Sequence, residues 1–183
     1  MNTENSIQIA TFGNGCFWCT EAIFNQLNGV LKAVSGYSGG STLNPDYKTV
    51  CAGLTGHAEC IQIEYDTSII SFEDLLEIFF NTHNPTTLNR QGEDVGTQYR
   101  SVVFYRTIDE KQITESYINQ LNTSGIFPNP IVTTLEPFHE FYPAEDYHQN
   151  YLSLNGHNPY CQLVVRPKVE KFKKIYAAKL KNV

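Results

Sequence analysis

The stretch Ile7–Cys19, IQIATFGNGCFWC, runs from a short apolar segment into two glycines, two aromatic rings and two thiols. Its first part, Ile7–Phe12, predicts a strand, and Gly13–Gly15 predicts a turn. A helix is expected from Cys16 onward, because one face of that helix would carry Thr20, Ile23, Phe24 and Leu27. Val30–Tyr37 then predicts a second strand, so the stretch opens a β-turn-α-β unit.

The rest of the chain predicts further strands and helices of one domain. Strands are expected over His57–Tyr65, Ser101–Arg106 and Ile131–Leu135, and helices after Ser71, after Thr107 and over 166–183. The long polar segment 82–100 predicts a functional loop, and 137–159 predicts irregular structure. The order β-α-β-β-α-β, then α-β, predicts a two-layer α+β domain with a mainly antiparallel sheet. We expect a single domain over 1–183, with its core at about 7–165 and a basic C-terminal helix at 166–183.

Charge is unevenly distributed along the chain. Thirteen Lys and Arg against 19 Asp and Glu give a net charge of −6. Residues 166–183 hold seven of the basic residues and one acid, so residues 1–165 carry −12. An acidic body is unsuited to binding phosphate backbones, and the basic end is typical of a solvated terminal helix. We therefore expect no nucleic-acid partner.

The cysteine count favours a reducing compartment. Five cysteines in 183 residues are odd in number and too few for a disulfide scaffold. Met1–Ser6 lack the basic and apolar pattern of a secretion signal, and no apolar run approaches the ~20 residues that span a membrane. We expect a cytoplasmic protein, unattached to membranes, in which Cys51 and Cys60 are buried.

Cys16 is the first candidate for a reactive group. It follows a predicted strand and begins a predicted helix, where unpaired backbone N–H groups and the helix dipole favour a thiolate. The glycines before it, the aromatic rings after it and a second thiol at Cys19 favour a nucleophile over a buried structural cysteine.

The Cys16-x-x-Cys19 spacing has three interpretations. Half of a zinc site would need two more ligands, and no second closely spaced pair accompanies the candidates His57, Cys60, His148 and Cys161. A thioredoxin-type dithiol would catalyse disulfide exchange. A nucleophile with a resolving thiol would close a disulfide after Cys16 has been oxidised. The spacing alone does not separate the last two, and we expect no metal.

Six separated motifs resemble, in this order, those of the peptide methionine sulfoxide reductase A family: GCFWC with Thr20-Glu21, Gly36–Gly40, Asp46-Tyr47, Val50–Glu59, Gly96–Ser101 and Ala144–Gln149. The resemblance covers about residues 9–165. It implies a ferredoxin-like two-layer α/β sandwich and reduction of the S-epimer of methionine sulfoxide, free or in proteins. It also implies repair of oxidised proteins without a cofactor, with thioredoxin or another dithiol as the reductant.

The resemblance implies the reacting groups. Cys16 matches the nucleophile that attacks the sulfoxide sulfur and becomes a sulfenic acid. Glu59 matches the carboxyl that protonates the sulfoxide oxygen, which requires a raised pKa and a partly buried site. Its position in the predicted strand does not by itself decide whether Glu59 is buried.

Five further residues match the pocket that binds the sulfoxide. Tyr47 and Tyr99 match phenols that hydrogen-bond its oxygen, and Asp94 matches a carboxylate of the same pocket. Phe17 and Trp18 match the apolar wall that receives the methyl group.

Two cysteines are candidates for resolving the sulfenic acid. The family more often has glycine where Cys19 stands, and Cys161 resembles its C-terminal resolving cysteine. The glycine-rich tail usual after that cysteine is replaced here by Val164–Pro167 and the basic helix. Cys19 lies one helical turn from Cys16, whereas Cys161 would need a mobile loop, and both candidates stay open.

Two rival functions use the same residues. A general thiol-disulfide oxidoreductase would act through Cys16 and Cys19 without any need for Glu59. A zinc-binding interaction module would hold stoichiometric zinc. We expect the reductase instead, acting as a monomer.

Overall fold

The computed structural model describes residues 6–182. Of Met1–Ser6, the segment in which we expect no secretion signal, only Ser6 lies inside this range. The strands are β1 (Ile7–Asn14), β2 (Val30–Ser38), β3 (Ala58–Asp66), β4 (Arg90–Gln91), β5 (Asp94–Val95), β6 (Ser101–Tyr105), β7 (Thr134–Pro137) and β8 (Phe141–Pro143). Strands β4 and β5 pair with each other, and the others form one sheet in the order β7-β6-β1-β3-β2-β8.

Helices connect most of these strands. They are α1 (Phe17–Phe24), α2 (Tyr47–Cys51), α3 (Phe72–Asn81), α4 (Ile108–Ser124), α5 (Tyr151–Asn155) and α6 (Arg166–Ile175). Short 3-10 turns are η1 (Thr97–Tyr99), η2 (Asp146–His148) and η4 (Ala177–Lys179), and η3 (Cys161–Val165) is a π-helical turn. None of the helices found in residues 6–182 has the length and hydrophobicity that a membrane-spanning helix needs.

The six-stranded sheet is mixed. The pairs β6–β1, β1–β3, β3–β2 and β2–β8 are antiparallel. Strand β7 pairs parallel with β6, because α4 carries the chain back along β6 before β7 begins. The sheet was predicted to be mainly antiparallel, and that prediction did not include the parallel pairing of β7 at the edge.

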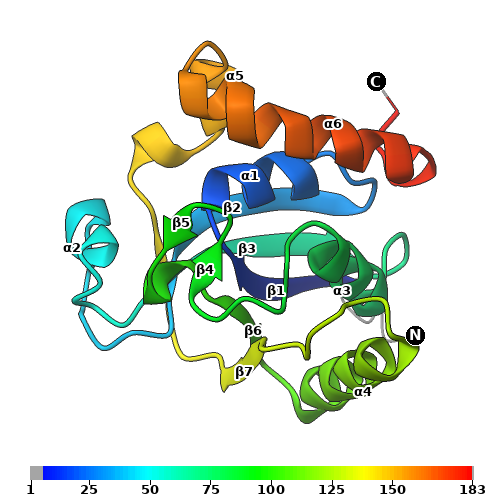
Figure 1. Ribbon diagram of the computed structural model, residues 1–183. Coiled ribbons are helices and arrows are strands. Elements are labelled where there is room, and N and C mark those ends of the chain that lie inside the picture. Colours follow the sequence, from blue (N-terminus) through cyan, green and yellow to red (C-terminus); the bar gives the residue numbers. More distant parts are fainter. Residues whose placement is uncertain (1–5, 183) are drawn as a thin grey trace.

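The larger core lies on the face of the sheet that the helices cover. Helix α1 lies between the sheet and α6, and α4 lies beside α3 (Figure 1). Phe12 of β1 meets the rings of Phe24, Phe72 and Phe79, so α1 and α3 share one face. The other face has a smaller cluster, Ala58, Cys60, Val102 and Phe104, covered by Phe138 and Phe141. Cys60 is buried there, as predicted.

Three segments differ from the sequence-based expectations. The strand expected over Ile131–Leu135 begins later, as β7, because the amide of Val132 donates to the carbonyl of Pro85 at 2.8 Å instead of joining the sheet. Segment 137–159, expected to be irregular, contains β8, η2 and α5. Segment 82–100, expected to be a loop, contains the β4–β5 hairpin and η1.

The C-terminal helix is longer at its start and shorter at its end than expected. Helical backbone already surrounds Cys161, and α6 ends at Ile175. Beyond it the chain pairs with the turn after α1: the amide of Asn28 donates to the carbonyl of Lys179, and the amide of Lys181 to that of Gln26, both at 2.8 Å. The end of the described chain is thus attached to α1.

Candidate active site

Cys16 begins α1 where β1 ends. It is the N-cap residue, and the amides of Cys19 and Thr20 approach its carbonyl oxygen at 3.2 and 3.5 Å. Gly15 before it has a φ of 103°, and a Cβ there would lie 2.8 Å from the side chain of Gln91. Glycine is therefore required for the turn that carries Cys16 from strand to helix.

A cavity of about 310 Å³ lies at this turn. Its lining comes from distant parts of the chain: Cys16, Phe17, Trp18, Tyr47, Glu59, Asp94, Tyr99, Tyr151, Asn158 and Tyr160. The structure thus brings together all seven residues predicted as nucleophile, proton donor, polar groups and apolar wall. Cys19 and Cys161 are not among the lining residues, and both are buried.

Glu59 lies on β3 and is 2% exposed. Its carboxyl Oε2 accepts a hydrogen bond of 3.2 Å from the amide of Phe17, the residue after Cys16. Burial raises the pKa of Glu59 well above its usual range, and negative charge on Cys16 raises it further. Both effects favour the protonated carboxyl beside the thiol, the form that can give a proton to a bound ligand.

Two phenols reach the cavity from short helical turns. Tyr47 begins α2, whose N-cap Asp46 accepts a hydrogen bond from the amide of Thr49 at 2.8 Å, and Tyr99 ends η1. Burial raises the pKa of both phenols, so both hydroxyls stay protonated and can donate. Burial raises the pKa of the nearby Cys51 thiol, and the two phenols lower it by less. Cys51, predicted to be buried, is partly exposed beside the site, because α2 turns only Val50 fully into the core.

Asp94 faces the cavity from the β4–β5 hairpin. Its Oδ2 accepts a hydrogen bond of 2.8 Å from the hydroxyl of Tyr160. Tyr160 lines the same cavity as Cys16, and burial raises the pKa of Tyr160. Tyr160 therefore joins the C-terminal segment to the cavity of the nucleophile, a position that the sequence prediction missed although it named the neighbouring Cys161.

Trp18 forms an aromatic wall next to Phe17. Its ring stacks on Tyr151 with centroids 3.7 Å apart and planes inclined by 4°. Its Nε1 donates to Nδ1 of His148 at 3.0 Å. Burial lowers the pKa of His148, so the imidazole stays neutral and able to accept this bond. The indole is thus held in one orientation, as an apolar binding wall requires.

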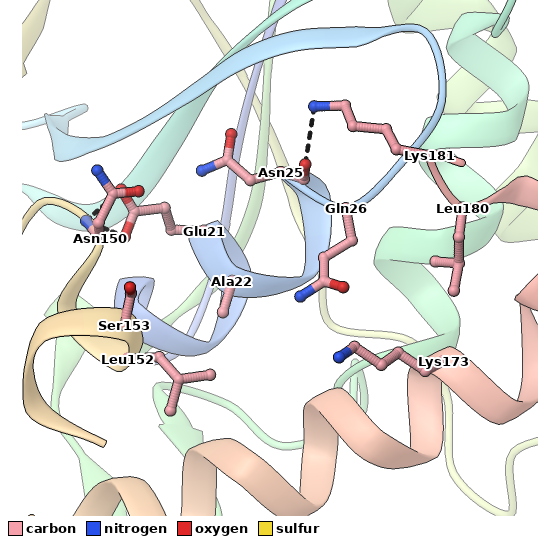
Figure 2. A pocket seen from close by; sticks show the side chains of 10 residues that line it. All are labelled: Glu21, Ala22, Asn25, Gln26, Asn150, Leu152, Ser153, Lys173, Leu180 and Lys181. Carbon is pink, nitrogen blue, oxygen red and sulfur yellow. Dashed lines mark hydrogen bonds between the residues drawn. The ribbon is translucent and has the colours of Figure 1, made fainter. Parts of the chain in front are cut away.

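Two carboxylates attach the segment after β8 to the site. Both oxygens of the buried Glu21 accept from the amide of Asn150 at 3.0 Å (Figure 2). Glu145 accepts from the hydroxyl of Tyr37 at 3.0 Å and from the amide of Tyr47 at 3.2 Å. A wider hollow of about 510 Å³ lies beside Glu21. Figure 2 shows the side chains that line it. The described residues that line it include no cysteine, histidine or tyrosine, so the candidate chemistry stays at the cavity of Cys16.

The two thiols of α1 have opposite pKa shifts. Burial raises the pKa of Cys16, and the adjacent Cys19 thiol raises it further. The hydroxyl of Tyr160 and the helix backbone at Trp18 lower it, but by less. Burial therefore outweighs the helix N-terminus, and the thiolate expected from the sequence is not the resting form. The hydrogen bond with Cys16 lowers the pKa of Cys19, against its burial, and Lys168 lowers it further.

Cys161 lies in the π-helical turn η3, and the expected mobile loop is absent from this part of the described chain. The amide of Gln162 donates to the carbonyl of Asn158 at 3.0 Å, which keeps the turn helical. Val165 and Val169 on the same helical run are buried in the main core and hold it in place. Among residues 6–182, no three His, Cys, Asp or Glu side chains are grouped to hold a metal ion.

Comparison with known proteins identifies the family. The profile described as peptide methionine sulfoxide reductase matches residues 8–180. The chain belongs to this family. Peptide methionine sulfoxide reductase MsrA of Saccharolobus solfataricus is 50% identical over 175 residues, 96% of this chain and 98% of that protein. The enzyme of the same name from Deinococcus radiodurans is 53% identical over 172 residues, 94% of this chain and 84% of that protein.

Solved structures of the reductase family share the fold. Methionine sulfoxide reductase A of Corynebacterium diphtheriae gives a TM-score of 0.74 at 33% identity, over 86% of this chain and 79% of that chain. Mxr1 from Saccharomyces cerevisiae in reduced form gives 0.73 at 32% identity, over 88% and 92%. Mxr1 in complex with Trx2 gives 0.51 at 23% identity, over 82% and 88%, a likeness that concerns the fold alone.

These matches confirm the family predicted from the six motifs, and with it an enzyme that reduces methionine sulfoxide through thiol chemistry. They also confirm a mixed α/β fold. The roles of single residues stay predictions at this point. Within the reductase cavity, Tyr151, Asn158 and Tyr160 are the lining residues that the motifs did not name, and their one sequence signal is the aromatic content of the segment before Cys161.

Proposed function

We propose that this chain reduces the S-epimer of methionine sulfoxide, free or in proteins, with Cys16 as nucleophile and Glu59 as proton donor. The observation that carries the proposal is the buried carboxyl of Glu59. Burial raises its pKa, and it accepts a hydrogen bond from the amide of Phe17, the residue next to Cys16. A thiol and a protonated acid in one apolar cavity are the two groups that removal of a sulfoxide oxygen requires.

The remaining cavity residues bind the sulfoxide group in this proposal. Tyr47 and Tyr99 keep their protons and donate hydrogen bonds to its oxygen. Phe17 and Trp18 receive the methyl group on their ring faces. Asp94 holds the hydroxyl of Tyr160 near the Cys16 sulfur.

The proposed step balances in atoms and electrons. Glu59 gives its proton to the sulfoxide oxygen while the Cys16 sulfur attacks the substrate sulfur. The bond between the substrate sulfur and its oxygen breaks, the bond formed between the two sulfurs breaks in turn, and the oxygen becomes bonded to Cys16 as a sulfenic acid. The substrate sulfur gains two electrons, which Cys16 loses, and the thiol proton of Cys16 returns Glu59 to its acid form. Methionine leaves.

Recycling needs a second cysteine, Cys19 or Cys161, and an external dithiol. We propose thioredoxin as that reductant, supported by the solved complex of the family member Mxr1 with Trx2. The five cysteines are free, which suits a reducing cytoplasm. The proposed cycle uses no metal or organic cofactor and repairs oxidised proteins. Because one chain supplies every cavity group, a monomer suffices.

We also propose that residues 1–183 act as one catalytic domain, about 7–165 being its core, with a ferredoxin-like two-layer arrangement. Support comes from the central strand order β6-β1-β3-β2 with α1 and α3 as the crossing helices. The strand β7 and the C-terminal helix are additions to that unit.

A pair of serine substitutions tests the function. Cys16→Ser is expected to lose all measurable reduction of methionine S-sulfoxide, because serine cannot form the sulfenic acid. Cys60→Ser is the matched control: it removes a thiol from the opposite face of the sheet and is expected to keep the wild-type rate. Chiral separation of the remaining sulfoxide should show that the R-epimer is left unreacted. Turnover by Cys16→Ser would refute the proposal.

A further inference from the structure

We infer that Cys19, and not Cys161, resolves the Cys16 sulfenic acid, through a disulfide that joins the N-cap of α1 to the third residue of the helix. The inference rests on the proposed function and adds the identity of the second thiol. It is carried by the backbone at the start of α1, by the surroundings of Cys19 and by the helical state of Cys161.

The start of α1 already holds the two thiols as a pair. Cys16 is the N-cap, and the amide of Cys19 approaches its carbonyl oxygen at 3.2 Å. The hydroxyl of Thr20 donates a hydrogen bond to the side-chain oxygen of Asn14, the last residue of β1, and so helps to fix the turn between β1 and α1. Residues three apart at a helix start lie within the Cα separation that a disulfide spans, so the bond requires little movement of the backbone.

The surroundings of Cys19 favour attack by this thiol. The charged and titratable groups that face it are Cys16 on its own helix, Asp94 on the β4–β5 hairpin, and Cys161 and Lys168 on the C-terminal helical run. Lys168 is the one cation among these described groups. Its positive charge favours the thiolate of Cys19, which is the form that attacks a sulfenic acid.

Cys161 is less suited to this first condensation. It is fully buried, its pKa is raised by burial, and it lies inside a helical run that packs on the main core. Its sulfur is held by a helical turn that packs on the main core, whereas Cys16 and Cys19 lie at the start of one and the same helix. Cys16 also lines the cavity through which a reductant reaches the Cys16–Cys19 disulfide.

The condensation balances. The Cys19 sulfur bonds to the Cys16 sulfur, the bond between the Cys16 sulfur and its hydroxyl oxygen breaks, and the hydroxyl leaves with the Cys19 proton as water. The Cys16 sulfur takes the electron pair of the attacking thiolate as hydroxide leaves. The external dithiol then reduces the Cys16–Cys19 disulfide to two thiols and is itself oxidised.

Mass mapping after one turnover tests the inference. Wild-type protein is mixed with methionine S-sulfoxide without reductant, alkylated, and digested with trypsin under non-reducing conditions. Because no Lys or Arg precedes Lys32, Cys16 and Cys19 share one peptide, which the inference expects to be two hydrogens lighter. A peptide linked to the one that holds Cys161 or Cys51 would overturn it.

Two variants and a methionine assay complete the test. Cys19→Ser should release about one methionine per chain, keep a Cys16 sulfenic acid that dimedone traps, and lose at least about tenfold in steady-state rate with thioredoxin. Cys161→Ser, the matched control, should stay within about twofold of wild type. The reverse result would overturn the inference while methionine release upholds the proposed function. Absence of methionine release from wild type would overturn both.

Discussion

At the residue scale, Glu59 links activity and stability in opposite directions. Glu59→Gln removes the proton donor but keeps an oxygen that can accept from the amide of Phe17. We expect the rate of sulfoxide reduction to fall by about 10²–10⁴-fold, the usual contribution of a general acid. The wild-type rate should itself fall as the pH rises through the raised pKa of Glu59. A general thiol-disulfide oxidoreductase would show neither effect.

The same substitution is expected to stabilise the fold at neutral and alkaline pH. The unfolded chain ionises Glu59 near pH 4.3, about its unperturbed pKa, whereas the folded protein keeps it protonated to a higher pH. Wild type therefore loses stability as the pH rises through this window, and Glu59→Gln does not. Thermal unfolding should show a higher midpoint for the variant at pH 8 and a difference that shrinks toward pH 4. A lower midpoint at pH 8 would contradict the buried, protonated carboxyl.

Single residues differ in how far their sequence context predicts them. Cys16, Phe17 and Trp18 could be placed in the site from the sequence, because one strand-turn-helix segment fixes them together. Tyr151 and Tyr160 could not, since their contacts with Trp18 and Asp94 depend on how the distant C-terminal segment packs. The raised pKa of Cys16 escaped prediction for the same reason: burial is a tertiary property, whereas the helix N-terminus is a local one.

At the element scale, the N-cap of α3 illustrates a local signal that the structure satisfies fully. The hydroxyl of Ser71 accepts from the amide of Asp74 at 3.0 Å, and the carboxylate of Asp74 accepts from the amide of Ser71 at 3.0 Å. Ser71→Ala should lower the free energy of unfolding by about 1 kcal/mol in denaturant titrations. Ser153→Ala, an exposed serine of α5, is the control and should change it by less than about 0.5 kcal/mol. Equal effects from both would show that the cap contributes nothing.

The elements that the sequence did not predict are those without a pattern of their own. Strand β8 has three residues, too few for a visible alternation, and exists because Phe141 and its neighbours pair with β2. The sequence Thr107-Ile-Asp-Glu110, before the helix predicted after Thr107, has the capping-box pattern, but the box forms only by half. The amide of Glu110 donates to the hydroxyl of Thr107 at 3.1 Å, but the carboxylate of Glu110 accepts from the amide of Arg106 instead.

At the scale of the whole molecule, the last residues hold α1 and α3 together. Tyr176 is buried, and its hydroxyl accepts from the side chain of Asn81 at 2.8 Å. Lys179 pairs with Asp74 at 2.6 Å, and its carbonyl accepts from the amide of Asn28. Removal of residues 176–183 should lower the free energy of unfolding by about 2–5 kcal/mol, mainly through the buried ring.

The truncated chain separates this attachment from catalysis. None of its missing residues lines the described cavity, so activity measured well below the unfolding midpoint should stay near the wild-type rate. Lys179→Ala in the full chain is the milder control and should cost at most about 1 kcal/mol, because the pair is partly exposed. An unchanged midpoint after truncation would mean that α1 and α3 pack independently of the chain end.

The stacking of Trp18 on Tyr151 also has an optical consequence. The chain contains a single tryptophan, so its indole emission comes from one place, beside Cys16 and against a tyrosine ring at 3.7 Å. Ligand entry, oxidation of the neighbouring sulfur or displacement of the C-terminal segment would each change the polarity and quenching around that fluorophore. The protein therefore carries a built-in, label-free fluorescent reporter of its own pocket, readable in real time during a turnover.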